Sequence, residues 1–179
     1  TWSRSLTTIG SYAFSGCTSL TSIELPASVK TIGDYAFDGC TLIDTIVLNE
    51  GLNDIGYNAF ASTAITELVI PNSVTTIYSN NNYNYSMVEN CQKLKKVVFG
   101  TGVTTVPAFL FQGLQALEEV VIGENVKTIC QNAFDGCTAL TSIVIPDNVT
   151  ELGDGAFGDC SSLSSIVIPD NVTEIDDDT

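Results

Sequence analysis

Hydrophobic residues recur along this chain at a fixed spacing. Residues 140–162 read LTSIVIPDNVTELGDGAFGDCSS, and residues 20–42 repeat the same order with LTSIELPASVKTIGDYAFDGCTL. The common form is L-x-x-I-x-I-P-x-x-V-T-x-I-G-x-x-A-F-x-G-C-x-x, which is 23 residues long. A period in the twenties is typical of a solenoid, in which stacked coils bury a core that no single coil could bury.

The pattern inside each repeat predicts its elements. L-x-x-I-x-I alternates apolar and polar positions, which favours a short strand with one buried side, and the following Pro ends that strand. V-x-x-I supplies two more inward anchors, and A-F-x-G-C suits one helical or 3₁₀ turn closed by Gly. We therefore predict an α/β repeat solenoid of right-handed coils, with a parallel sheet on the concave face and short helical turns on the convex face.

No linker or change of composition divides the chain, so we expect a single leucine-rich-repeat domain over residues 1–179. It holds six full coils, which begin at Leu20, Ile43, Ile65, Leu94, Leu117 and Leu140 and are called coils two to seven below. Partial coils, called one and eight, lie at the two ends, and we interpret the chain as a piece of a longer protein. Coil three is one residue short, whereas coil four carries six extra residues within positions 78–90.

The repeat resembles the BspA-type leucine-rich repeat, most closely in residues 20–42 and 140–162. Proteins with this repeat are surface proteins of gut and oral bacteria and of some mucosal protozoa. The resemblance implies an extracellular or cell-surface location and a role as an adhesin that binds host or bacterial partners. It supplies no catalytic residues to transfer.

Charge and missing motifs narrow the function further. The net charge is −15 and there is no His, which argues against binding to nucleic acid or to anionic lipid. The sequence has no catalytic triad, no H-E-x-x-H and no phosphate loop, so we predict neither an enzyme nor a cofactor. Acidic residues at equivalent positions of successive coils, such as Glu124, Asp147 and Asp170, could hold calcium, but screening by water and salt explains them more simply. We predict no metal site, and no apolar run is long enough for membrane insertion in this segment.

Two ladders of side chains are expected in the core. One repeat position carries Cys17, Cys40, Cys91, Cys137 and Cys160, but it also accepts Thr63 and Leu114. A small buried side chain therefore satisfies the position, and we expect reduced thiols, although Cys17/Cys40 and Cys137/Cys160 would lie within disulfide range. Phe residues at a second position should form a stacked aromatic ladder.

The candidate binding residues lie on the strands and in the insertion of coil four. The outward strand position carries Val47, Val69, Val98, Val121, Val144 and Val167, a row that strand propensity alone could also explain. The insertion interleaves Tyr78, Tyr83 and Tyr85 with Asn residues such as Asn82, a composition typical of antibody paratopes but also compatible with a tolerated loop. Lys93, Lys95 and Lys96 follow as a basic cluster.

We therefore predict an extracellular or cell-surface binding module that recognises a protein or glycan partner on a host or neighbouring cell. The hypothetical site lies around coils four and five and consists of Tyr78, Asn82, Tyr83, Tyr85, Lys96, Val69, Val98 and Val121. The alternative is a structural spacer that carries a binding domain elsewhere in the parent protein.

Overall fold

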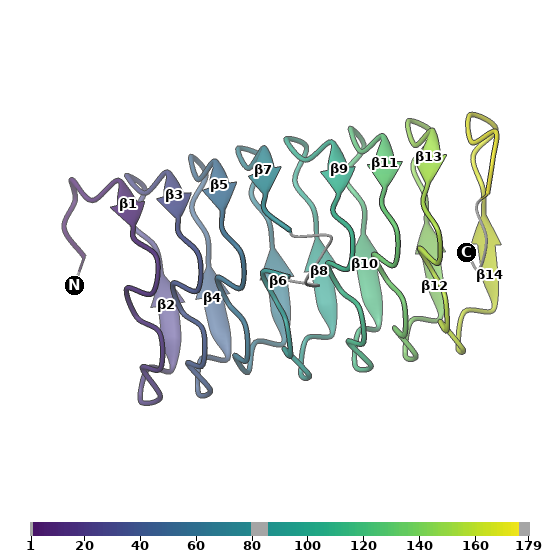
Figure 1. The fold of residues 1–179 in the computed structure, drawn as a ribbon. Coiled ribbons are helices and arrows are strands. Elements are labelled where there is room, and N and C mark those ends of the chain that lie inside the picture. Colours follow the sequence, from purple (N-terminus) through teal and green to yellow (C-terminus); the bar gives the residue numbers. More distant parts are fainter. Residues whose placement is uncertain (1, 80–85, 176–179) are drawn as a thin grey trace.

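The chain forms a stack of coils in which every strand is parallel to its neighbours (Figure 1). The computed structural model describes residues 2–79 and 86–175. The three-residue strands form what we call the broad ladder: β2 (Ser22–Glu24), β4 (Thr45–Val47), β6 (Glu67–Val69), β8 (Lys96–Val98), β10 (Glu119–Val121), β12 (Ser142–Val144) and β14 (Ser165–Val167). The two-residue strands form the narrow ladder: β1 (Thr8–Ile9), β3 (Thr31–Ile32), β5 (Asp54–Ile55), β7 (Thr76–Ile77), β9 (Thr105–Val106), β11 (Thr128–Ile129) and β13 (Glu151–Leu152).

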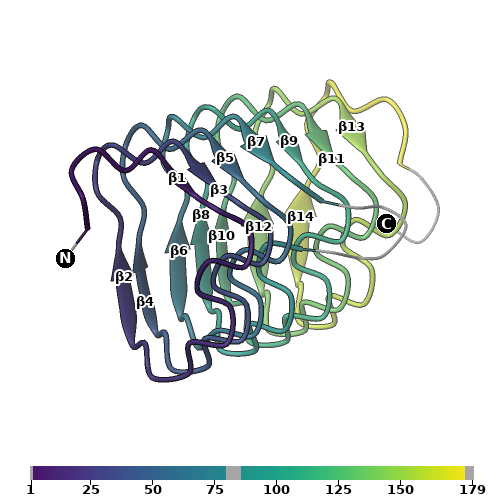
Figure 2. The same ribbon diagram turned by 60° about the vertical axis from the view of Figure 1, so that its left-hand side comes forward.

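Equivalent repeat positions pair across neighbouring coils. Ile23 pairs with Ile46 in the broad ladder, and Ile9 pairs with Ile32 in the narrow one. The sequence period therefore sets the strand register, and the predicted parallel solenoid with coils of about 23 residues is confirmed. The narrow ladder was not predicted, because the V-x-x-I segment was expected to supply buried anchors rather than a second set of strands. Figure 2 shows the two ladders on different sides of the stack.

The predicted helical turns are wrong, and so is the α/β class: the described residues contain strands and turns but no helix. The reason is a left-handed residue at each end of the A-F-x segment, for example Tyr12 and Gly16 with φ of 60° and 72°. Only three residues lie between them, too few for the i to i−4 bonds of an α-helix. The N–H groups alternate instead: Ser15 donates within its own turn to Tyr12, whereas Phe14 donates to Ala36 of the next coil. These turns thus form a third set of hydrogen bonds between coils, which we call the turn ladder.

The core runs through the whole stack. Phe37, Phe60, Phe111 and Phe134 are fully buried, and Phe134 stacks on Phe111 with ring centroids 5.3 Å apart. All six cysteines are free thiols, and the thiol of Cys160 donates to the carbonyl of Phe134 in the preceding coil. Of the five cysteines in the ladder, Cys17 is exposed, so the expectation of burial fails there.

The irregular coils interrupt the ladders at two junctions. The broad ladder divides between β4 and β6, where coil three is one residue short, while the narrow ladder continues from β5 to β7. The narrow ladder divides between β7 and β9, although β6 and β8 of the same coils pair fully. In the regular coils the residue after each narrow strand donates its N–H to the preceding coil, as Gly56 does to Ile32. Pro107 occupies that position in coil five and has no N–H, which removes the bond.

Gly56 follows a narrow strand and packs closely against the preceding coil, and we expect Gly56→Ala to destabilise the fold. A methyl group at Gly56 would lie 2.6 Å from the amide nitrogen of Asp34 and 2.7 Å from the carbonyl carbon of Gly33. Overpacking of this kind costs about 1–3 kcal/mol of unfolding free energy, measured by urea denaturation. Gly10→Ala is the matched control, because Gly10 occupies the same repeat position with no atom within 4 Å. Equal stability losses in the two variants would contradict the packing argument.

Candidate binding surfaces

The outward side chains of the broad ladder form what we call the strand face. The valine row lies along it, and Val47, Val69 and Val121 are about half exposed, at 51%, 50% and 44%. Val144 and Val167 are more exposed still, whereas Val98 is intermediate. The inward residues of β4 to β12, such as Ile46, are buried, so the alternation predicted from sequence places an apolar row on an otherwise acidic molecule.

A hollow interrupts this row where β4 and β6 are not paired. Its volume is about 260 Å³, and it is lined by Asp44, Thr45, Ile46, Val47, Thr66, Glu67 and Val69. At the following junction, where the broad ladder is continuous, Lys95 donates its backbone N–H to the carbonyl of Thr66. Within the described residues no corresponding bond joins the Thr66 N–H to the carbonyl of Asp44. The hollow therefore combines apolar walls from two valines with carboxylates at its rim.

The lysines of the predicted basic cluster are partly neutralised. Lys95 contacts Glu118 at 2.8 Å and Lys96 contacts Glu119 at 3.1 Å, both between Nζ and a carboxylate oxygen of the next coil. The partners lie 23 residues further along the chain, so only an alignment of the repeats reveals them. Lys96 remains on the strand face, but as one half of an ion pair.

The structure separates the other predicted site residues from the valine row. Tyr78 follows β7, on the narrow ladder, and its ring lies edge-on to Tyr57 with centroids 5.9 Å apart. Lys96 lies on β8 of the broad ladder, on a different side of the coil (Figure 2). Asn82, Tyr83 and Tyr85 lie outside the described residues. Val69, Val98, Val121 and Lys96 therefore share one face, and Tyr78 does not belong to it.

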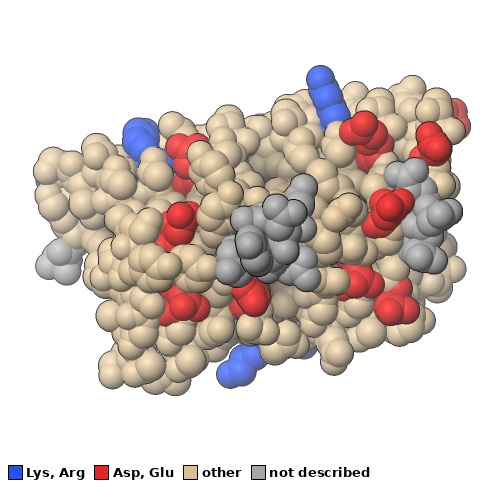
Figure 3. All heavy atoms as spheres, viewed as in Figure 1, with Lys and Arg blue, Asp and Glu red and all other residues tan. Residues whose placement is uncertain are grey.

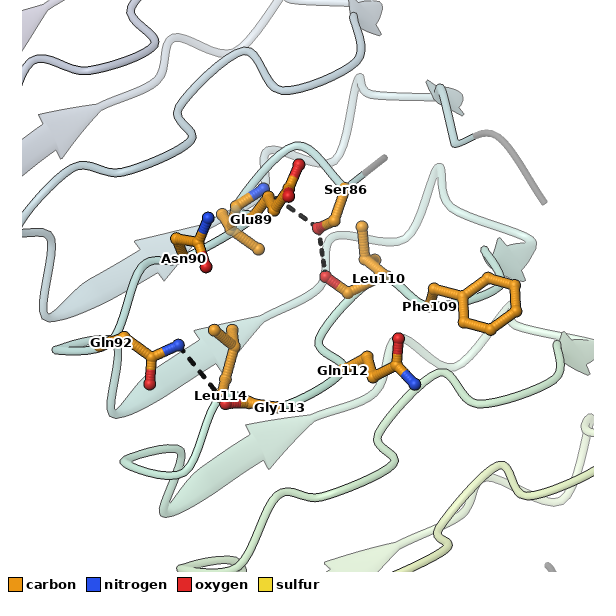
Figure 4. Close-up of a pocket in the computed structure, with 10 residues that line it drawn as sticks. Ser86, Glu89, Asn90, Gln92, Phe109, Leu110, Gln112, Gly113 and Leu114 are labelled. Carbon is orange, nitrogen blue, oxygen red and sulfur yellow. Dashed lines mark hydrogen bonds between the residues drawn. The ribbon is translucent and has the colours of Figure 1, made fainter. Parts of the chain in front are cut away.

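A second depression, which we call the turn pocket, lies between the turns of coils four and five (Figure 4). Its volume is about 300 Å³, and it is lined by Ser86, Val88, Glu89, Asn90, Gln92, Phe109, Leu110, Gln112, Gly113 and Leu114. None of these residues was in the predicted site, although residues 86–90 belong to the stretch that holds the insertion of coil four. One available signal was Asn90, which stands at the left-handed turn position held by Gly in coils one, two, five and six.

The turn pocket exists because side chains replace the turn ladder at this junction. In a regular coil the backbone N–H equivalent to that of Val88 donates to the next coil. Here the N–H of Val88 donates to the Ser86 hydroxyl at 3.1 Å, and that hydroxyl donates to the carbonyl of Leu110. At the other end Gln92 Nε2 donates to the carbonyl of Gly113 at 3.4 Å. These two side-chain bridges join the turns in place of the backbone bonds (Figure 4).

The described part of the chain shows few features of a basic, metal-binding or membrane-spanning site. Acidic side chains are scattered over the face in Figure 3, and the few basic ones lie near its margins. Within residues 2–79 and 86–175 there is no group of three or more His, Cys, Asp or Glu side chains placed to hold a metal ion. The same residues include no helix long and apolar enough to cross a membrane.

The comparisons with known proteins agree with the coil geometry. Residues 1–89 and 84–179 match the family described as BspA type leucine rich repeat region (6 copies). The chain belongs to the BspA-type leucine-rich repeat family. No curated protein matches it. The predicted resemblance is therefore confirmed, and the family is one of repeat modules that are generally not catalytic.

Two solved structures are similar to this BspA-type chain. A leucine-rich repeat protein from Bacteroides ovatus is 34% identical with a TM-score of 0.73, over 94% of this chain and 48% of that one. A leucine rich repeat protein from T. pallidum is 29% identical with a TM-score of 0.72, over 88% of this chain and 72% of that one. The chain thus spans about half the length of the Bacteroides ovatus protein.

Proposed function

We propose that this chain is a binding module displayed outside the cell or on its surface, and that a protein partner docks on the strand face. The observation that carries the proposal is the exposed valine row, which is fixed in register by paired strands. Flat apolar centres with a polar rim are typical of protein interfaces. The surface location rests on the family, whose members are surface proteins.

The charge of the chain favours a partner with basic residues around an apolar centre. The molecule carries −15 overall, and Glu67 and Asp44 lie beside the hollow between β4 and β6. A partner's lysine or arginine could lay its aliphatic stem against Val47 and Val69 and direct its charge to these carboxylates. The complex should associate faster and have a higher affinity at low salt than at high salt.

The test is the double variant Val69→Ser/Val121→Ser. Both residues lie on the strand face, and together they should contribute enough apolar contact that binding weakens at least about tenfold, or about 1.4 kcal/mol. Affinity would be measured by biolayer interferometry against an array of purified extracellular-matrix proteins. Leu42→Ser is the matched control, because Leu42 is 55% exposed but lies on the turn side of its coil.

Two results would count against a protein-binding strand face. One is a partner that binds the double variant as tightly as the unaltered chain, which would place the interface elsewhere. The other is an array on which no protein binds, which would favour the second candidate function, a stiff spacer. The near-identity of coils seven and eight, IVIPDNVTE in both, is the feature that favours a spacer.

A further inference from the structure

We propose that the turn pocket binds a neutral sugar ring, as part of a glycan. This site lies on the turns and is separate from the protein-binding strand face proposed above. The inference starts from the junction of coils four and five, which are paired at the broad ladder but not at the narrow ladder. Among the described residues, no backbone hydrogen bond joins their turns either. The backbones of the two coils are therefore hydrogen-bonded at the broad ladder, whereas within the described residues they are not at the narrow ladder or between the turns.

Within the described residues, two of the three ladder bonds have no counterpart at this junction. The first would join the Ser86 N–H to the Ala108 carbonyl, as Tyr12 is joined to Asp34 elsewhere. At regular junctions the left-handed residue before the Cys position donates its N–H across the turn ladder, as Gly113 does to Asp135 at 2.8 Å. The equivalent pair here is the Asn90 N–H and the Gln112 carbonyl, and within the described residues neither has a backbone partner. Both flank the turn pocket, between the bridge from Ser86 and the bridge from Gln92.

Side-chain amides add further donors and acceptors, of which Gln112 Nε2 already donates to Asp135 Oδ2 at 2.8 Å and Gln92 Nε2 to the carbonyl of Gly113. Asn90 and Gln92 come from coil four and Gln112 from coil five, and Figure 4 shows them on opposite sides of the space between the turns. Val88 and Leu114, both buried, supply apolar surface in the same lining. A sugar ring presents hydroxyl groups that donate and accept, together with apolar C–H faces, and this mixture matches it.

The charges of the pocket favour a neutral ligand. No Lys or Arg is among its lining residues, so an anionic sugar or a phosphate would gain no counter-charge on a molecule of net charge −15. The carboxylate of Glu89 already accepts a hydrogen bond from Asn58 Nδ2. That bond occupies one oxygen of Glu89, which is the single charged side chain among the lining residues, so a cationic ligand would meet one carboxylate only.

The spacing of the free groups favours a sugar over an extended peptide. A peptide strand needs a series of unpaired backbone groups along an edge. At this junction the Ser86 hydroxyl occupies the Val88 N–H and the Leu110 carbonyl, which form the middle pair of the ladder. The unpaired groups on either side of it therefore do not form a continuous edge. The volume of about 300 Å³ lies at the lower end of ligand pockets and suits one small group rather than a chain.

The test uses the whole chain with named probes in saturation-transfer and ¹⁵N-HSQC NMR. The neutral probes are D-glucose, D-galactose and N-acetyl-D-glucosamine; the comparison probes are N-acetylneuraminic acid, inorganic phosphate and triglycine. We expect at least one neutral sugar to bind with a Kd of about 1 mM, and the amide signals of Asn90 and Gln112 to shift. The comparison probes should leave those signals unchanged.

The variant Asn90→Gly/Gln112→Ala should weaken the sugar's binding at least about tenfold. It should fold normally, because Gly suits the left-handed φ of 59° at Asn90 and is the residue found there in other coils. Gln115→Ala is the matched control, since Gln115 is exposed and does not line the pocket. The Val69→Ser/Val121→Ser variant should bind the sugar unchanged, which keeps the two sites distinguishable.

Three results would overturn the proposal. The first is no response to any neutral sugar at about 50 mM, well above the expected Kd. The second is sugar binding that the Asn90→Gly/Gln112→Ala variant leaves unaltered. The third is a stronger response to triglycine or to an anion than to the sugars, which would assign the pocket to a different ligand. None of these results bears on protein binding at the strand face.

Discussion

Phe134→Ala is expected to lower the free energy of unfolding by about 3–5 kcal/mol. Phe134 is completely buried, and its ring is stacked between Phe111 and Phe157 with centroid distances of 5.3 and 5.4 Å. The substitution would remove contacts with the coils on both sides. Since each coil is stabilised mainly by its neighbours, the cavity can be filled only by moving whole coils. Urea denaturation followed by circular dichroism measures the loss.

Phe14→Ala is the matched control for this prediction. Phe14 occupies the same repeat position in coil one, but it is only partly buried and stacks on one ladder member, Phe37, with Trp2 at its edge. Its loss should be clearly smaller than that of Phe134. A midpoint for Phe134→Ala that matches the unaltered chain would mean that the phenylalanine ladder does not hold the stack together.

The parts of the fold that the sequence predicted are those that depend on equivalence between repeats. In stacked coils each strand residue pairs with the residue at the same repeat position of the next coil. A 23-residue period therefore specifies parallel strands in register, as for Ile23 and Ile46. The alternation in L-x-x-I-x-I likewise predicted which residues are buried and which form the valine row. These predictions needed only the identity of the residues and the period.

The turns were predicted wrongly because their conformation depends on φ angles that residue type does not fix. Tyr12, Tyr35 and Asn58 all adopt positive φ at one repeat position, which side chains of this size adopt rarely. The A-F-x segment therefore looks helical from composition, whereas its backbone alternates bonds within the turn and to the next coil. The neighbouring coil supplies the acceptors, and a single repeat read alone cannot show them.

The hollow on the strand face and the turn pocket depend on departures from the repeat, and these departures were predicted only in part. The insertion in coil four was visible in the sequence, but its effect on the next coil was not. Pro107 removes a ladder donor at one side of this junction, and Ser86 substitutes a hydroxyl at another. The lysine ion pairs were also missed, because Glu118 and Glu119 are neighbours in space and one repeat away in sequence. Each of these features combines residues from two coils.

The second large effect is expected at alkaline pH, from the buried cysteine ladder. Burial raises the pKa of the Cys91 thiol from its ordinary value near 9 to about 11, and burial likewise raises the pKa of Cys137. In the unfolded chain the thiol of Cys91 has its ordinary pKa. Below pH 9 the thiol is protonated in both states, so its contribution to stability is fully present. Between about pH 9 and 11 only the unfolded chain loses the proton, and stability falls as the pH rises.

We expect Cys91 alone to cost about 3 kcal/mol of unfolding free energy across this window, because two pH units at 1.36 kcal/mol each separate the folded and unfolded pKa values. Cys91→Thr removes the ionising group and keeps a donor, since Thr63 fills the same position in coil three and donates to the carbonyl of Phe60 at 2.8 Å. Urea denaturation at about pH 8.5 and about pH 11 should therefore show a smaller loss of stability for Cys91→Thr than for the unaltered chain. Cys17→Thr is the control and should behave like the unaltered chain, because Cys17 is exposed. If Cys91→Thr loses as much stability at high pH as the unaltered chain, desolvation of the buried thiols is not what limits the alkaline stability of the stack.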